Sequence, residues 1–237
     1  YTYNESSCVT GDEATCEVTK CYETKTANSC PAGTIIKYRV NSGEMKVFYV
    51  MHDDGAIMTM QQRENTVNNH IWYEGEISNA YGPTKVLSAL ELATKSWTNV
   101  NTINYTMGTT VFKTNAYTGC SAYNSCTTNT YTLSERSAKA RMITLQEATD
   151  LGCTSEARSC PIWMYNYLQL STLNGGTIDD KTAGPDATSM GNVAYWTLSA
   201  NSSYNQLALH ISYMGYLLIN DVFNTTDSAR AVIEINK

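Results

Sequence analysis

Eight cysteines constrain the fold of this chain more than any other feature. They form three groups with even counts, and two groups are close pairs that bracket short polar segments: Cys120 with Cys126, and Cys153 with Cys160. Such spacing favours local disulfide bonds. The remaining four allow three connectivities, among which the sequence does not choose: Cys8, Cys16, Cys21 and Cys30.

A zinc site would need close Cys-x-x-Cys pairs, and the chain has none. We therefore predict that all eight cysteines form disulfide bonds, rather than binding metal or remaining free thiols. Disulfide bonds persist in oxidising compartments, so we expect the protein to be made for an extracytoplasmic space. Any membrane attachment would need an anchor helix before Tyr1, because the chain has no apolar run that could serve as one.

The charge balance excludes one large class of partner. Charged residues make up 16 % of the chain and the net charge is −6, with no cluster of Lys or Arg. A nucleic-acid-binding surface would need such a cluster. We expect no nucleic acid as a partner.

The alternation of apolar residues predicts a three-stranded meander over residues 30–62. Strands are expected at 34–40, 45–52 and 57–61, with turns at 41–44 and at Asp53-Asp54-Gly55. The polar residues 1–31 lack apolar groups for a core and form a cysteine-rich N-terminal segment, while residues 32–237 form the main domain.

Helical signals follow the meander. Thr84 is the expected cap of a helix whose apolar face comprises Val86, Leu87, Leu90, Ala93 and Trp97. Thr144 and Glu147 have the spacing of a capping box. A third short helix is expected within 160–170, and the Gly- and Asp-rich residues 171–192 are expected to form a surface loop.

The stretch 201–228 has the composition of a display surface. It contains no Lys, Glu, Arg or Trp, and only Gln206 and Met214 fall outside the fifteen amino acids encoded by codons ending in C. Two apolar segments, 195–200 and 229–235, flank this stretch and are predicted to form core strands. Polar and aromatic residues between rigid strands are typical of recognition surfaces.

Four segments occur in the order found in one family: Arg141 to Ala148 (RMITLQEA), Tyr195 to Ala200 (YWTLSA), Gly215, and Ala229 to Val232 (ARAV). Together they resemble the C-type lectin-like fold, in the branch that includes formylglycine-generating-enzyme-like domains and the variable proteins of diversity-generating retroelements. The resemblance implies an α+β fold with a small mixed sheet, two or three helices and disulfide staples.

In the variable proteins, adenines of a template are randomised during reverse transcription, so asparagine codons become other codons that end in C or T. The resemblance implies that residues of about 201–228 vary in this way, with Gln206 and Met214 as fixed positions. Residues 228–230 (Ser-Ala-Arg) depart from the family by lacking its usual glycine. The segment from Cys30 to Thr34 (CPAGT) is similar to bacterial surface proteins that begin with a type IV pilin-like anchor helix. The resemblance implies an extracellular location, at a bacterial cell surface or pilus.

Spacing within 204–224 predicts which residues are buried: Ala208, Ile211, Gly215, Leu217 and Val222. The residues expected to face outward and bind a ligand are Tyr204, Asn205, Leu207, His210, Ser212, Tyr213, Tyr216, Leu218, Asn220, Asp221, Phe223 and Asn224. Tyrosine offers a large contact area with few torsions to restrict. The alternative is that the leucine-rich parts of this stretch are ordinary core strands.

The sequence gives only weak indications of catalytic or metal-binding residues. His210 has no evident carboxylate partner in the sequence, so we expect a contact residue rather than a catalytic base or a metal ligand. Arg141 and Glu147 are expected to form a partly buried structural ion pair rather than an active site. Three aspartates could contribute to a calcium site or simply form turns, and we expect turns and no cofactor: Asp179, Asp180 and Asp186.

Three functions compete. The first is a cell-surface receptor or adhesin that binds a protein or peptide through its variable region. The second is a structural pilin-like subunit without diversified binding. The third is an enzyme of the formylglycine-generating type, which needs a cysteine late in the domain; none follows Cys160, so we expect no enzyme.

Overall fold

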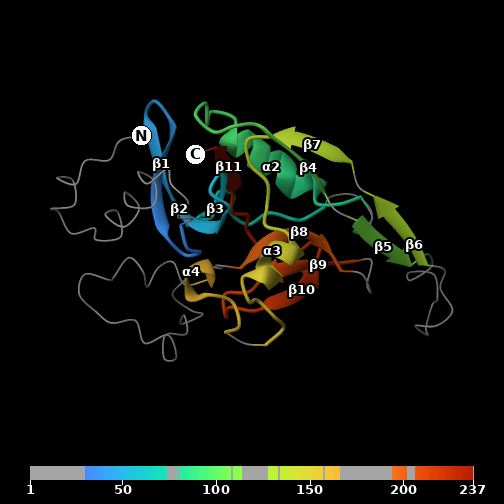
Figure 1. The fold of residues 1–237 in the computed structure, drawn as a ribbon. Helices are drawn as coiled ribbons and strands as arrows, with labels where there is room; N and C mark the ends of the chain where they lie inside the picture. Colours follow the sequence, from blue (N-terminus) through green and yellow to red (C-terminus); the bar gives the residue numbers. More distant parts are fainter. Residues whose placement is uncertain are drawn as a thin grey trace.

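The computed structural model describes residues 30–73, 79, 81–107, 109–113, 128–132, 134–156, 158–165, 194–201 and 206–236 (Figure 1). The fold is α+β with strands predominating. Predictions for the N-terminal segment, for the loop at 171–192 with its aspartates and for several single residues lie outside the described part: Cys8, Cys16, Cys21, Cys120, Cys126, Tyr204 and Asn205.

The predicted meander is present and gains a fourth strand from the C-terminus. β1 (Ile35–Asn41), β2 (Glu44–Asp53) and β3 (Ile57–Gln62) are antiparallel neighbours, and β11 (Val232–Asn236) pairs antiparallel with β3. The order is β1-β2-β3-β11. The final strand therefore closes the fold against its N-terminal part (Figure 1).

Local hydrogen bonds explain the two turns of this sheet. The Asn41 side chain accepts from the Gly43 amide at 3.0 Å, and Asp54 accepts from the Ala56 and Ile57 amides at 2.8 and 2.7 Å. Gly55 has a φ of +90°, a conformation that side chains resist. Short polar side chains that bond to the backbone thus fix both turns.

Helix α2 (Thr84–Thr94) confirms the predicted helix, with two corrections. Thr84 is the first helical residue rather than the cap: Pro83 occupies the cap position, and no side chain caps the helix. Ala93 is exposed, and Thr94 is buried in its place. The rest of the predicted face is buried in the core: Val86, Leu87, Leu90 and Trp97.

The C-terminal half contains a second sheet. β8 (Tyr195–Ala200), β9 (Leu207–Ile211) and β10 (Leu217–Asp221) pair in the order β10-β9-β8. Two smaller antiparallel pairs join β4 (Ile103–Thr106) to β7 (Glu135–Ala138) and β5 (Thr109–Lys113) to β6 (Thr128–Thr132). The prediction of a mixed sheet is wrong for the described strands: all their pairings are antiparallel, and parallel pairing is limited to an isolated bridge between Tyr195 and Ser228.

Two short helices flank the second sheet. α3 (Leu145–Asp150) begins with the predicted capping box, in which Thr144 Oγ1 accepts from the Glu147 amide and the Glu147 carboxylate accepts from the Thr144 amide. α4 (Ile162–Tyr165) lies within the predicted third helix. Its Trp163 ring packs against Tyr49 of β2, with the centroids 5.2 Å apart and the ring planes tilted by 35°, and so joins the two halves.

The core has two clusters. The larger packs α2 against the four-stranded sheet and includes Trp72, Trp97 and Trp196, all 2 % exposed or less. The smaller surrounds a disulfide bond between Cys153 and Cys160. That bond confirms one predicted pair, and Cys30 is also disulfide-bonded. Within the described residues, no helix is both long and apolar enough to span a bilayer.

Candidate ligand-binding hairpin

The predicted display stretch is a β-hairpin rather than a loop. The framing segments are strands as predicted, with β8 on one side and β11 on the other, but β9 and β10 lie between them and pair directly. The register joins Leu207 to Asp221, Leu209 to Ile219 and Ile211 to Leu217 on one face of the hairpin. His210 with Leu218, and Ala208 with Asn220, occupy the opposite face.

The predicted buried positions are confirmed. Ala208, Ile211 and Val222 have no exposed surface, Leu217 is 7 % exposed, and Gly215 is buried. Ala208 and Val222 belong to the larger core cluster, whereas Ile211 and Leu217 belong to the cluster around the disulfide bond. The hairpin therefore packs against both parts of the core.

His210 corrects a prediction. It is only 7 % exposed, and its Nδ1 lies 2.6 Å from Oδ2 of Asp227, which is 2 % exposed. The same carboxylate oxygen accepts a bond of 3.0 Å from the Asn220 amide, and the His210 ring lies 5.9 Å from that of Trp196. A buried imidazole beside a buried carboxylate anchors the hairpin to the segment before β11, so His210 is not available as an outward contact residue.

Ser212 corrects a second prediction. It is 2 % exposed because it closes the turn between β9 and β10. Its Oγ accepts from the Met214 amide at 3.0 Å, and its own amide donates to the Tyr216 carbonyl at 3.0 Å. The side chain therefore shapes the turn.

The turn is clamped by the disulfide-bonded loop 153–160. The Leu217 amide donates to the Thr154 carbonyl at 2.7 Å, and the Cys160 amide donates to the Gly215 carbonyl at 2.9 Å. Gly215, with a φ of +75°, lies directly against the Tyr165 ring of α4. Backbone bonds and close packing thus fix this end without using the side chains of Tyr213, Met214 or Tyr216 as anchors.

The opposite end is fixed just as firmly. Nδ2 of Asn79 donates to the carbonyls of Asn201 and Leu207, at 3.0 and 2.6 Å. The Trp72 amide donates to the Val222 carbonyl at 2.9 Å. Phe223 packs against the larger core cluster, so its ring is half-buried.

The solvent-accessible part of the hairpin is smaller than predicted. Of the described residues expected to face outward, Asp221 is exposed and the others, apart from His210 and Ser212, are half-buried: Leu207, Tyr213, Tyr216, Leu218, Asn220, Phe223 and Asn224. These residues do not form one patch, since Leu218 and Asn220 lie on the face that carries His210.

Within 204–224, two exposed residues were missed. Ile219 is 42 % and Met214 43 % exposed. With Leu207, Leu209 and Asp221 beside it, Ile219 forms a continuous surface on the outer face of the hairpin, which we call the hairpin face. Two-residue alternation from the buried Leu217 places Ile219 on the same face and so predicts burial. The exposure of Ile219, like that of Met214, is therefore decided by the tertiary structure.

The hairpin has the chemistry of a contact surface. The hairpin face combines aliphatic side chains with one carboxylate, and the turn adds two tyrosines and a methionine. Among the described residues, no group of three His, Cys, Asp or Glu side chains could hold a metal ion. Such a surface can bury apolar area and form a few hydrogen bonds.

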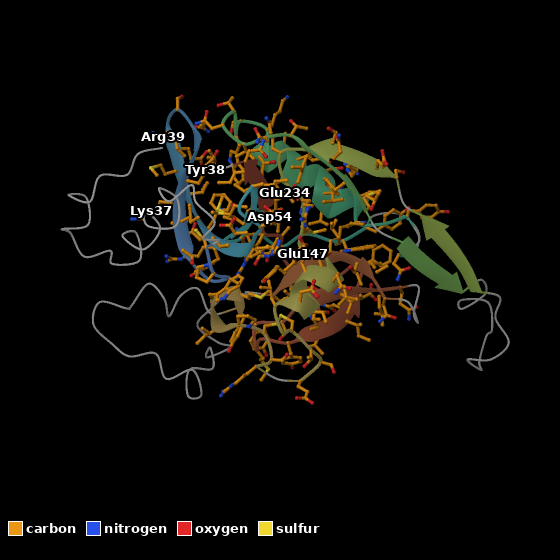
Figure 2. The ribbon with its side chains drawn as sticks, in the orientation of Figure 1. Lys37, Tyr38, Arg39, Asp54, Glu147 and Glu234 are labelled. Carbon is orange, nitrogen blue, oxygen red and sulfur yellow. A yellow bond between two sulfur atoms is a disulfide. The ribbon has the colours of Figure 1, made fainter. Side chains whose placement is uncertain are left out.

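Arg141 and Glu147 form the expected ion pair. Two Arg141 nitrogens lie 2.8 and 2.6 Å from the Glu147 oxygens, and Nη2 also lies 3.2 Å from Glu234 of β11. Figure 2 shows the two glutamates on separate elements, α3 and β11. Burial opposes ionisation of Glu147, but the Arg141 and Thr144 hydrogen bonds outweigh it and lower the carboxyl pKa. The arrangement is structural.

Comparisons of the chain with protein-family models, with curated protein sequences and with solved structures gave no match. The function must therefore be argued from the chain itself.

Proposed function

We propose that the protein is a cell-surface receptor or adhesin, not an enzyme, and that it binds a protein or peptide through its C-terminal hairpin. The observation that carries this proposal is the combination of a rigidly held backbone with surface side chains that the anchoring does not use; of these, Asp221 makes one local bond, accepting from the Phe223 amide at 3.0 Å. The hairpin is anchored at the turn by the 153–160 loop and at the other end by Asn79 and Trp72. The side chains of the hairpin face take no part in that anchoring.

A rigid backbone suits recognition because little conformational entropy is lost when a partner binds. Ile219 and Leu209 offer apolar area at the centre, and Asp221 offers a charge at the rim. This arrangement is typical of contact surfaces between proteins. The disulfide bond fits a protein that works in an oxidising compartment.

The resemblance to retroelement-diversified C-type lectin-like proteins supplies the expected source of binding variety. If the hairpin is diversified, sibling copies of the gene within one population should differ mainly at exposed or half-buried hairpin positions: Leu207, Leu209, Tyr213, Tyr216, Ile219 and Asp221. The anchoring residues should stay fixed, because the scaffold depends on them: Ala208, His210, Gly215 and Asp227.

Sequencing the sibling genes, with the chromosomal region around them, tests the proposal. Substitutions confined to the exposed hairpin, beside a template repeat and a reverse-transcriptase gene, would support it. Substitutions scattered over the whole surface would contradict it and favour a structural surface subunit.

A further inference from the structure

The outer edge of the second sheet carries unpaired backbone groups. β10 is the edge strand: β9 pairs with it on one side, and no described strand pairs with it on the other (Figure 1). Hydrogen-bonded pairs recur at every second residue of an antiparallel ladder. The Val222 amide donates to the Gln206 carbonyl at 2.9 Å in the register of this ladder, so Leu218 and Asn220 bond to β9. The backbone N–H and C=O of Ile219 therefore point away from the sheet.

No described residue forms a hydrogen bond with these two groups of Ile219. On one side of them, the Leu217 amide donates to the Thr154 carbonyl of the disulfide-bonded loop at 2.7 Å. On the other side, the Asp221 amide donates to Oδ1 of Asn220 at 2.9 Å. Ile219 lies between these two bonds and is 42 % exposed. An exposed edge with unpaired backbone groups can accept another strand.

The other edges of the two larger sheets are protected. β1 carries Lys37 and Arg39, and charged side chains discourage strand addition. At the opposite edge of that sheet, Val232 of β11 exchanges two backbone hydrogen bonds with Arg141, at 2.7 and 3.0 Å. β8 likewise donates to backbone carbonyls outside its sheet. β10 has no Lys, Arg or Pro, and the apolar Ile219 lies at its centre.

The side chains beside this edge define the chemistry of a partner. Ile219 and Leu209 present aliphatic surface on the hairpin face, which suits a strand with apolar residues at alternate positions. The Asp221 carboxylate is exposed and forms no ion pair with a described residue. A Lys or Arg at one end of the incoming strand would complement it.

A second copy of the chain fits this edge poorly. Antiparallel pairing centred on Ile219 would place the Asp221 of each copy opposite the Leu217 of the other, where the Thr154 carbonyl already lies. The net charge of −6 also opposes self-association. A peptide segment avoids both obstacles, because it needs to fit only between the disulfide-bonded loop and Asp221.

We propose that β10 binds an extended peptide segment of a partner protein as an added strand, with alternate apolar residues and a basic residue beside Asp221. This inference rests on the proposed function for the class of partner and adds the mode of binding. Backbone hydrogen bonds supply affinity that does not depend on the hairpin-face side chains, and those side chains select among partners. Backbone recognition would therefore persist when the side chains vary.

Amide hydrogen exchange of the full chain, measured by nuclear magnetic resonance, tests the proposal. The probe is the peptide Lys-Thr-Val-Thr-Val-Thr-Lys, blocked at both ends. Without peptide, the Ile219 amide should exchange faster than the Leu218 amide, which bonds to β9. We expect a dissociation constant in the millimolar range, and peptide at about twice that concentration should slow exchange at Ile219 about threefold. The Val50 amide of the other sheet is the reference and should not change.

Two N-methylated forms of the probe separate backbone recognition from side-chain recognition. One is methylated at the valine amides and the other at the threonine amides, so their side chains are identical. Only one of these sets of amides faces β10, so the two affinities should differ by at least about tenfold. Equal affinities for the two forms would overturn strand addition, even if both were weaker than the parent peptide.

Two variants of the protein test the same point from its own side. Ile219→Ala removes the side chain and keeps the N–H, whereas Ile219→Pro also removes the donor, a change that edge strands tolerate where the N–H faces outward. The proline variant should bind the probe at least about threefold more weakly than the alanine variant. Equal binding by two folded variants would contradict the proposal, and the methylated peptides decide the question if the proline variant does not fold.

The remaining outcomes separate this proposal from the receptor function. No protection of Ile219 at about 10 mM peptide would overturn strand addition. Protection that rises with protein concentration in the absence of peptide would assign the edge to a second copy and would also overturn it. Neither result bears on whether sibling genes differ at the hairpin, so the receptor function can fail or stand separately.

Discussion

At the scale of single residues, Gly215 is the position where the hairpin turn has least freedom to change. Its φ of +75° belongs to the left-handed region, and an added Cβ would overlap the Tyr165 ring. Gly55 has a similar φ of +90°, but a Cβ there would meet open space. Comparing alanine substitutions at the two glycines therefore distinguishes the cost of backbone strain from the cost of steric overlap.

We predict that Gly55→Ala costs about 1 kcal/mol of unfolding free energy, from backbone strain alone. Gly215→Ala should cost about 2–4 kcal/mol, because Tyr165 must also move. Urea denaturation of both variants measures the difference. Equal losses would mean that the turn yields without strain and that the hairpin is less rigid than its contacts indicate.

His210 illustrates how a neighbour distant in sequence determines the role of a residue. Its flanking residues are apolar or small, as expected for a contact position, but Asp227, seventeen positions later, lies beside its Nδ1. A buried carboxylate needs hydrogen-bond donors, and His210 and Asn220 supply them. The sequence pattern contains no sign of that pairing, because it depends on how the segment before β11 crosses the hairpin.

At the scale of elements, the disulfide-bonded loop 153–160 and the hairpin turn behave as one unit. Two backbone hydrogen bonds join them, from Leu217 to Thr154 and from Cys160 to Gly215. Both cysteines are buried in the smaller core cluster together with Ile211 and Leu217. The disulfide bond therefore supports the far end of the proposed binding surface as well as its own loop.

Replacing both cysteines by serine should destabilise the protein by roughly 2–3 kcal/mol, the chain-entropy value for so short a loop. Hydrogen exchange should show faster exchange of the Leu217 amide. The Val50 amide, which donates to Thr34 at 2.9 Å in the other sheet, serves as the reference and should change less. An unchanged Leu217 amide would show that the loop does not support the turn.

At the scale of the whole molecule, Arg141 joins three parts of the chain. Its guanidinium contacts Glu147 at the start of α3 and Glu234 of β11, and its backbone pairs with Val232. These contacts join β11 to the segment that precedes α3. Arg141 is buried, so the loss of Glu147 would leave its charge with Glu234, at 3.2 Å, as the remaining carboxylate partner.

The ion pair between Arg141 and Glu147 predicts that the stability of the protein depends on pH. The Glu147 pKa is lowered from its ordinary 4.5, so the folded state holds that proton less tightly than the unfolded state. The stabilisation is present in full above about pH 4.5 and is lost as pH falls through the lower pKa of the folded state.

Glu147→Gln should lose about 2–3 kcal/mol of unfolding free energy at neutral pH. Its difference from the wild type should shrink in acid below pH 4.5. Glu156→Gln, at an exposed position, is the matched control and should change little. Thermal unfolding between pH 3 and 7 measures the trend, and a difference that stays constant over this range would contradict the assignment.

Local patterns determined much of this protein. The meander, the capping box, the Cys153–Cys160 bond, the Arg141–Glu147 pair and the buried positions of the hairpin all follow from residues close together in the sequence, where short-range geometry and alternating burial act directly. Tertiary structure alone decided which hairpin side chains are accessible. His210 is buried because Asp227 packs against its face of the hairpin, and Ser212 is buried because it closes the turn. Ile219 is exposed because the 153–160 loop covers its face only beside the turn, over Ile211 and Leu217.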